Sequence, residues 1–468
     1  MVILTYRPVS SGQPGMDTGP RGHVETTFIE ARRTSIMKRS WLIKLTMVVA
    51  LALVFSACSS TDDSTGTTAG AAKTTTTAGA AETTTTAAAA ETTTTAPAST
   101  EPIKIGLLTS LTATFAPWGV SVRDGMRLAV QEINAAGGVT GRQLELLERD
   151  DQSNPEEGAS GLERLIEDGA VAVGGVISSS VGLSTARIAE ELAVPLFLVK
   201  AGSDAILTTD SRYTFRTCLP AAPMIAGPIA QFAKINGITK VGAIVADYAW
   251  GQAVKSALEA EFAGVEGVEL QIEVAPVPEK DFAAYLRRLD DFGTEIIVAT
   301  GHPPGGVSIT KQSADFGMDL EVTGSWNPLG LIVGAAGEQA FDRYADFACV
   351  DYDSQGYQDL ARTYLAFSDN TFMEDDAVAG YGIVYAIAEA VGEVGDDPVA
   401  VAEYMHANTF DIPGYSFPLS WTEWGEIAAA QPTFVVIREQ EPPEGVSPGA
   451  NWYPELLVLS DPLEPYVP

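Results

Sequence analysis

Short apolar runs alternate with segments of helical periodicity from Ile103 onward. Runs such as IKIGLL and AVAVGGV have the length of buried strands, and the segments between them repeat apolar residues every three or four positions. The same rhythm returns after Pro220, in runs such as KVGAIVAD and EIIVAT. Repeated strand–helix units predict parallel sheets covered by helices on both faces. Two series of such units predict an α/β fold with two similar, doubly wound lobes.

The first hundred residues follow a different pattern. A basic patch that begins at Lys38 precedes an apolar segment from Leu45 to Phe55, and small residues then lead to Cys58. This layout is typical of a secretory signal. The stretch FSAC resembles a lipobox, in which the chain is cut before Cys58 and the thiol receives lipid. Phe55 departs from the usual leucine, so a plain signal peptide or an uncleaved anchor is the alternative. We expect residues 1–57 to be an upstream extension and a signal peptide.

Residues 58–101 are dominated by threonine and alanine, as in TTTTAGAAETTTT. A segment with almost no large apolar side chain cannot bury a core. Behind a lipidated Cys58, it would serve as a disordered tether. We therefore expect an exported protein that is lipid-anchored at the outer face of the cytoplasmic membrane, or periplasmic.

Charge and composition exclude several classes of function. The formal net charge of −33 argues against nucleic acid as a partner. The sequence has only three histidines and three cysteines, and no G-x-S-x-G, H-E-x-x-H or G-K-[ST] motif. The acidic pairs Asp150–Asp151 and Asp375–Asp376 are interpreted as structural or solvated. We expect no enzymatic activity, no cofactor and no metal.

Three serines, Ser178 to Ser180, follow the third predicted strand and open a helix. Ligands of open α/β sheets bind beyond the carboxyl ends of the strands. Free N–H groups at a helix N-terminus favour an anion there, and serine hydroxyls add donors. A helix cap would account for one serine but not for three. The sequence therefore predicts a ligand site at this junction.

A series of longer motifs occurs in order along the folded part. They are IGLLTSLTATFAPWG, GMRLAVQEINAAGGVTGRQLELLERDDQSNP, VGGVISSSVGLSTARIAEELAVPLFL, AGSDAIL, YTFRT, DYAWGQA, DFAAYLRRL, GYGIVYAIAEAV and PLSWTEWGE. Together they resemble the leucine/isoleucine/valine-binding family of substrate-binding proteins for ABC transporters, from about Ile103 to Arg438. The resemblance implies a type I periplasmic binding protein fold, whose two lobes close on a small molecule about a hinge. It also implies delivery of that molecule to a membrane permease.

The resemblance also implies a division of the chain. Lobe 1 would comprise 102–217 and 351–411, and lobe 2 would comprise 218–350 and 412–440. The remaining residues, 441–468, are expected to form a C-terminal surface tail. We expect a monomer whose partners are a small ligand, the ABC permease and, through its lipid, the membrane. A ligand-sensing lipoprotein with the same clamp and a signalling partner is the alternative.

The family's site maps onto named residues of this sequence. Ser178 and Ser179 would bind a ligand carboxylate, while Ala201 and Ser203 would offer a backbone carbonyl or amide and a hydroxyl. Further pocket positions would be filled by aromatic and histidine side chains, namely Trp118, Trp250, His302, Trp326 and Tyr381.

One position departs from the family pattern. Trp326 falls where amino-acid binders often place a glutamate that pairs with the ligand's ammonium group. A buried ammonium without a carboxylate costs several kcal/mol. Either Asp204 or Asp247 replaces the glutamate, or the ligand lacks an ammonium group. The ligand class stays open between a branched-chain amino acid and an aromatic or other carboxylate or amide.

Two cysteines follow the family's hinge pattern. Cys218 and Cys349 would lie on neighbouring segments that cross between the lobes. Because exported proteins can keep disulfides, the resemblance implies a bond between them. The alternative is a pair of buried free thiols.

Overall fold

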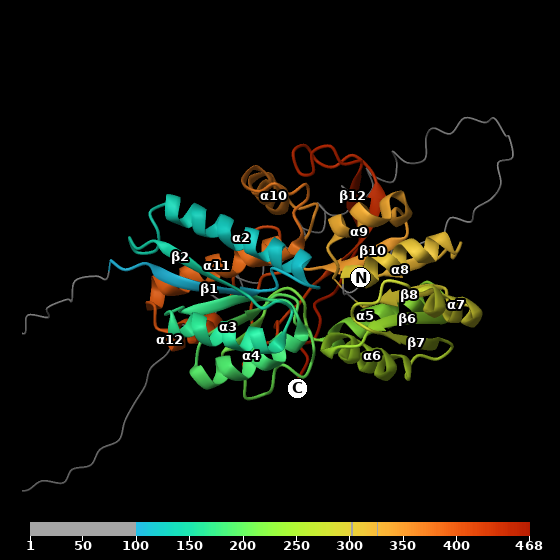
Figure 1. The fold of residues 1–468 in the computed structure, drawn as a ribbon, viewed down its shortest axis with the longest axis horizontal. Helices are drawn as coiled ribbons and strands as arrows, with labels where there is room; N and C mark the ends of the chain where they lie inside the picture. The colour runs from blue at the N-terminus through green and yellow to red at the C-terminus, as the bar shows by residue number, and fades with distance from the viewer. Residues whose placement is uncertain (1–99, 301–302, 325) are drawn as a thin grey trace, which may run out of the picture. The chain divides into compact units, whose positions relative to one another are not determined.

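The computed structural model describes residues 100–300, 303–324 and 326–468. The expected signal, the lipidation site at Cys58, the tether up to Ser99 and the pocket residue His302 lie outside these described residues. Two sheets organise the described chain, and Figure 1 shows their strands as two separate groups.

The first lobe is built on a five-stranded sheet in which all strands are parallel. In spatial order they are β2 (Leu144–Asp150), β1 (Ile103–Thr109), β3 (Ala172–Val176), β4 (Leu196–Leu198) and β5 (Thr214–Arg216). The interior strands are almost entirely buried, as their apolar runs predict. The short strand β5 falls in the motif YTFRT, which carries no long apolar run.

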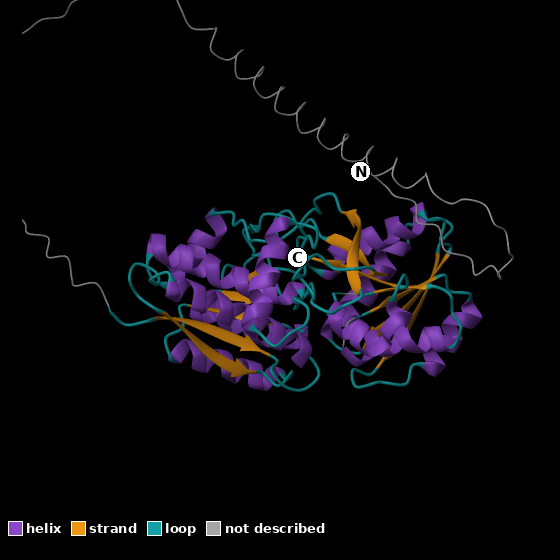
Figure 2. Cartoon of the chain, turned by 90° about the horizontal axis from the view of Figure 1, so that it is seen from above, coloured by secondary structure: helices purple, strands orange, loops and turns teal. Residues whose placement is uncertain are grey.

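Helices cover both faces of this sheet, as Figure 2 shows. The first-lobe helices are α2 (Ala116–Ala135), α3 (Pro155–Glu167), α4 (Ser179–Leu192), α10 (Gln355–Phe367), α11 (Asp375–Val394) and α12 (Pro398–Ala407). The two faces can be identified from glycines in the strands. A methyl group at Gly174 would meet Met126 of α2 and Ile383 of α11, and one at Gly106 would meet Leu165 of α3. The chain therefore returns to the first lobe with α11, which is mostly buried.

The second lobe is built on a seven-stranded sheet. In spatial order its strands are β12 (Trp452–Leu459), β11 (Thr433–Glu439), β10 (Tyr344–Ala348), β9 (Glu321–Thr323), β8 (Ile296–Ala299), β6 (Lys240–Ala246) and β7 (Glu269–Ala275). Strands β6 to β10 are parallel, whereas β11 and β12 pair antiparallel. The expectation of parallel sheets therefore holds for the first lobe and for five strands of the second.

The C-terminal segment differs from the expected surface tail. Residues 452–459 form the edge strand β12, which pairs with β11 along its whole length. Trp452 and Tyr453 are buried, and the rings of both lie near Phe372. The segment is rich in proline and glutamate on either side, but the strand itself, WYPELLVL, is mostly aromatic, leucine and valine, which suit a strand. The exact limits of the two lobes stay a prediction.

The helices of the second lobe complete its layers. They are α5 (Ala222–Ile235), α6 (Ala249–Phe262), α7 (Ala283–Phe292), α8 (Pro303–Asp315), α9 (Leu329–Ala336) and the 3₁₀ turn η1 (Gly337–Ala340). Helices α5 and α6 pack on each other, as do α8 and α9.

The hinge carries the predicted disulfide. Cys218 follows β5 and Cys349 follows β10, so each lies where the chain leaves a sheet. The two cysteines are bonded, with their Cα atoms 5.2 Å apart. Both are fully buried. The prediction of a Cys218–Cys349 bond is therefore confirmed.

Candidate ligand-binding site

The serines at the start of α4 form a buried polar cluster with the loop after β4. Ser178 is the N-cap residue, yet its side chain makes no capping hydrogen bond. Ser179 Oγ accepts a hydrogen bond from the backbone N–H of Ser203 at 3.1 Å. The three residues are 1–3% exposed. We call Ser178, Ser179 and Ser203 the serine cluster, which the structure brings together as predicted.

A buried arginine holds the loop that contributes Ser203. The guanidinium of Arg216 donates to the carbonyl of Ala201 and, at 2.6 Å, to the carbonyl of Ser203. Its third partner is the carboxylate of Glu426, at 3.0 Å. Because Arg216 binds the carbonyls of Ala201 and Ser203, those two carbonyls already have a hydrogen-bond donor. The predicted ligand contacts are then the backbone N–H of Ala201 and the hydroxyl of Ser203.

Trp250 brings the second lobe against this loop. It lies in the first turn of α6 and is 2% exposed. A methyl group at Gly202 would lie 2.5 Å from the Trp250 ring, so only glycine lets the indole come this close. The predicted aromatic Trp250 therefore faces the loop of the serine cluster.

A second aromatic contact joins the lobes at the N-terminus of α2. Trp118 Nε1–H donates to the carbonyl of Trp326 at 2.9 Å, and both residues are buried. Next to this bond, the rings of Phe115 and Tyr248 lie 5.4 Å apart. The structure therefore places two more predicted residues, Trp118 and Trp326, where the lobes meet.

The segment that carries Trp326 is held by a buried acid. Asp346 accepts hydrogen bonds from the backbone N–H groups of Trp326 and Asn327, each at 2.8 Å. A Cβ on Gly324 would lie 2.0 Å from this carboxylate, so glycine is required there. Burial raises the pKa of Asp346 to about 6, although its hydrogen bonds act in the opposite direction.

Tyr381 does not join the other predicted residues. Its hydroxyl donates to Glu132 at 2.7 Å, and its ring packs at a tilt against that of the exposed Tyr385, with centroids 4.6 Å apart. Glu132 lies about 20 Å along α2 from Trp118. The structure therefore does not bring Tyr381 together with the other predicted residues, because its hydroxyl binds Glu132 between α2 and α11.

Sequence reasoning missed a charge cluster beside the hinge. Lys200 Nζ lies 2.9 Å from Asp375 and 3.4 Å from Asp376, and all three residues are buried. Burial alone would lower the pKa of Lys200, but the two aspartates outweigh it and raise that pKa. The pair Asp375–Asp376 is thus structural rather than solvated. The sequence feature that could have indicated this cluster is the lysine at the end of the apolar run VPLFLVK, because a lysine beside a buried strand needs an acidic partner.

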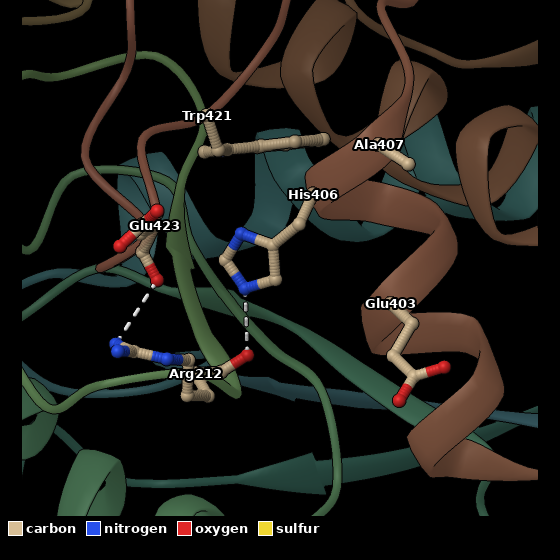
Figure 3. Close-up of a pocket in the computed structure, with 6 residues that line it drawn as sticks. All are labelled: Arg212, Glu403, His406, Ala407, Trp421 and Glu423. Carbon is tan, nitrogen blue, oxygen red and sulfur yellow. Dashed lines mark hydrogen bonds between the residues drawn. The ribbon is translucent and has the colours of Figure 1, made fainter.

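A separate hollow of about 390 Å³ opens at the other end of the first-lobe sheet (Figure 3). His406 lies in it between two backbone carbonyls, those of Arg212 at 2.9 Å and Thr422 at 3.1 Å. Arg212 precedes β5, so the hollow is at the amino ends of the strands. Ligands of such sheets bind at the carboxyl ends, and the hollow contains none of the predicted residues. Its lining is Arg212, Glu403, His406, Ala407, Trp421 and Glu423.

The fold and the site together define a class. Two α/β lobes meet through aromatic side chains, beside hydroxyls and a helix N-terminus at the carboxyl ends of the strands. This arrangement suits binding of a small anionic or polar molecule between the lobes.

Comparison with known proteins agrees with that class. Residues 102–436 match the periplasmic binding protein family, which is more than half of the chain. This chain therefore belongs to the periplasmic binding protein family. The relatives are solute-binding proteins rather than enzymes.

The matches to individual relatives span most of the length of those relatives. The Leu/Ile/Val-binding protein BraC3 of Rhizobium johnstonii is 27% identical over 348 residues, which cover 70% of this chain and 94% of the relative. A leucine-, isoleucine-, valine-, threonine- and alanine-binding protein of Pseudomonas aeruginosa is 26% identical and covers 67% of this chain and 85% of its own.

Solved structures show the same fold. A solute-binding protein of R. palustris in complex with benzoate has a TM-score of 0.65 at 22% identity, covering 78% of this chain and 98% of its own. The branched-chain amino acid transporter substrate-binding protein LivJ of Streptococcus pneumoniae, in complex with isoleucine, has a TM-score of 0.63 at 22% identity. The match covers 76% of this chain and 100% of LivJ.

Proposed function

We propose that this protein is the extracytoplasmic substrate-binding lipoprotein of an ABC importer. It captures a small amino acid, or a related carboxylate or amide, between its two lobes and delivers it to the permease. The relatives named above bind branched-chain amino acids, and one structural neighbour holds benzoate, which supports a small carboxylate as ligand. Cys58 carries the lipid, and residues up to 101 tether the clamp.

The observation that carries this proposal is the buried contact between Ser179 Oγ and the N–H of Ser203. It puts a hydroxyl group at the free N-terminus of α4, where the helix dipole favours an anion. The serine cluster holds the carboxylate, and Trp118, Trp250 and Trp326 cover the ligand from the side where the lobes meet. Since the ligand contacts both lobes, it binds the closed form best and shifts the population toward it.

Thermal-shift screening of small carboxylates, amides and amino acids tests the proposal. A ligand at about 100 times its Kd stabilises the protein by about 2.7 kcal/mol, which raises the melting temperature. Calorimetry of the Ser179→Ala variant should then show affinity lowered by about 1–3 kcal/mol. An unchanged affinity would put the hydroxyl outside the site.

Ser184→Ala is the matched control for this experiment. Ser184 lies on the same helix, but its hydroxyl donates to the carbonyls of Pro155 and Val181. The control should bind as the unchanged protein does. For the lipid anchor, labelling with a fatty acid should be lost in Cys58→Ser, and labelling that persists would contradict that part of the proposal.

A further inference from the structure

The second lobe contains a buried hydrogen-bond donor that finds no acceptor. Trp326 is 1% exposed, and its Nε1–H has no hydrogen-bond partner among the described residues. Leaving such a donor unpaired in the interior is unfavourable, because its hydrogen bond to water is lost on burial. The indole N–H of Trp118, in contrast, is paired with the Trp326 carbonyl. Of these two indole donors, that of Trp326 is the one left over for a ligand.

The surroundings of Trp326 fix the orientation of this donor. Its backbone has φ +62°, in the left-handed region that a bulky residue rarely adopts. Asp346 holds the backbone N–H, and the indole stacks on Phe347 with ring centroids 5.2 Å apart. A strained conformation persists only where its surroundings over-determine it, and such residues cluster at ligand sites.

The charged groups beside Trp326 interact mainly with one another. Lys200 Nζ lies 5.9 Å from the centroid of the Trp326 ring. Asp346 already accepts four hydrogen bonds, from three backbone N–H groups and from the hydroxyl of Tyr344. Lys200 donates to Asp375 and lies 3.4 Å from Asp376, whose oxygens make no hydrogen bond among the described residues. Asp346 and Asp375 therefore have hydrogen-bond donors before any ligand arrives, and the charge of Asp376 is balanced by Lys200.

The two acids considered for an ammonium partner are also unsuited. Asp247 is exposed and accepts a hydrogen bond from Gln252 at 2.8 Å. Asp204 is half-buried, and its carboxylate interacts electrostatically with the guanidinium of Arg216. Neither residue is therefore a fully buried carboxylate that could serve as the partner of a buried ammonium group.

We infer that the ligand presents to the second lobe an uncharged hydrogen-bond acceptor, and no ammonium group. This inference rests on the proposed function, since it describes the molecule bound between the lobes. The ligand is then a small carboxylate with an additional oxygen, such as a 2-oxo acid. The serine cluster holds its carboxylate, and Trp326 Nε1–H donates to its second oxygen.

Two series of three compounds test this inference by calorimetry on the full-length protein. The aliphatic series is 4-methyl-2-oxopentanoate, leucine and 4-methylpentanoate; the aromatic series is phenylpyruvate, phenylalanine and 3-phenylpropanoate. In the series whose side chain fits, the 2-oxo acid should bind about 5- to 10-fold more tightly than the acid without the oxo group. The amino acid should bind at least about 10-fold more weakly than the 2-oxo acid.

The Trp326→Phe variant identifies the donor. It should bind the 2-oxo acid and the plain acid with equal affinity, because the N–H that distinguishes them is gone. Comparing two ligands on one variant cancels the packing lost with the smaller ring. Trp452→Phe is the control, since Trp452 lies in β12 and contacts Phe372; it should keep the preference.

The outcomes separate this inference from the proposed function. Tighter binding of leucine or phenylalanine than of the matching 2-oxo acid would overturn the inference and leave the importer function intact. A preference for the 2-oxo acid that persists in Trp326→Phe would overturn the role of the indole. No binding of any of the six compounds would contradict the inference, and the absence of any ligand in the wider panel would contradict the function itself.

Discussion

The two lobes contribute segments of different chemistry to the proposed site, and a buried acid takes part in holding each. We call the loop of the serine cluster the first wall and the segment around Trp326 the second wall. In the first lobe, the loop of the serine cluster is held by Arg216, whose charge is paired with Glu426. In the second, the backbone at Trp326 is held by Asp346 through N–H and hydroxyl donors. The first support is an ion pair, whereas the second depends on a single carboxylate whose pKa is raised to about 6.

This difference has a consequence for how each wall responds to change. A buried ion pair fails when one partner is removed, because the other charge remains unpaired. A buried acid held by neutral donors responds to pH instead. The stability of the first wall should therefore be sensitive to mutation of the Arg216–Glu426 pair, and that of the second wall should depend on pH.

The largest expected effect comes from the hinge that both walls share. Replacing Cys218 and Cys349 by serine opens a loop closed over a separation of 131 residues. The free energy of unfolding should fall by about 4–5 kcal/mol in the chain-entropy model, as measured in urea. Ligand affinity should stay within about twofold, since neither cysteine belongs to either wall. Unchanged stability would show that the hinge does not need the bond.

Breaking the ion pair of the first wall should be nearly as severe. Arg216→Met leaves the buried Glu426 without its partner, and unfolding should become easier by about 3–5 kcal/mol. Adding Glu426→Leu should restore much of that stability but not ligand affinity, because the carbonyls of the loop still lack their donor. As a control, Arg187→Met removes only an exposed pair with Glu191 and should cost under about 0.5 kcal/mol. Restored affinity in the double variant would contradict the positioning role of Arg216.

The second wall should lose stability as the pH rises. Glu374 accepts hydrogen bonds from the N–H groups of Leu329 and Gly330 at the start of α9, and burial raises its pKa from 4.5 to about 8. The folded state therefore binds this proton more tightly than the unfolded state does. The contribution of this proton to the free energy of unfolding is complete below about pH 4.5, and it is lost as the pH rises through about 8.

The slope of stability against pH measures this effect. Between about pH 6 and 7, Glu374 should account for a loss of up to about 1.4 kcal/mol in the free energy of unfolding. Glu374→Gln should flatten that slope, whereas Arg187→Met, at an exposed ion pair, should leave it unchanged. An equal slope in the Glu374 variant would mean that the wall does not depend on this proton.

The smallest effect should come from the contact between the walls. Trp118→Phe removes the hydrogen bond to the Trp326 carbonyl and with it about 1 kcal/mol of closure. Ligand affinity should fall about fivefold by calorimetry. If affinity is unchanged, the two tryptophans do not contact each other in the ligand-bound form.

Much of this fold could be predicted from the sequence because its strands are buried on both faces. Runs such as IKIGLL and EIIVAT have the length and composition of buried strands. The segment from Asp359 to Val394 has a helical pattern but divides into α10 and α11, with Ser368 at the C-cap of the first. Edge strands such as β12 carry weaker patterns, because one side of them has no neighbour.

The candidate site was predicted in part for a similar reason. The serines could be placed because strand order and helix N-termini follow from the local pattern. Arg216, Lys200 and Asp346 could not, since their partners are not evident from the local sequence; Glu426, for example, lies far along the chain from Arg216. The contact of Tyr381 with Glu132 could not be predicted either, because an aromatic residue on a helix gives no indication of which neighbour its hydroxyl meets.

A crystal structure with the tightest-binding compound of the panel tests the central claim most directly. The account predicts a ligand between the lobes, with its carboxylate within about 3.2 Å of a hydroxyl or N–H of the serine cluster and with Trp250 and Trp326 in contact with it. A ligand found elsewhere, such as in the hollow around His406, with the serine cluster untouched, would contradict it.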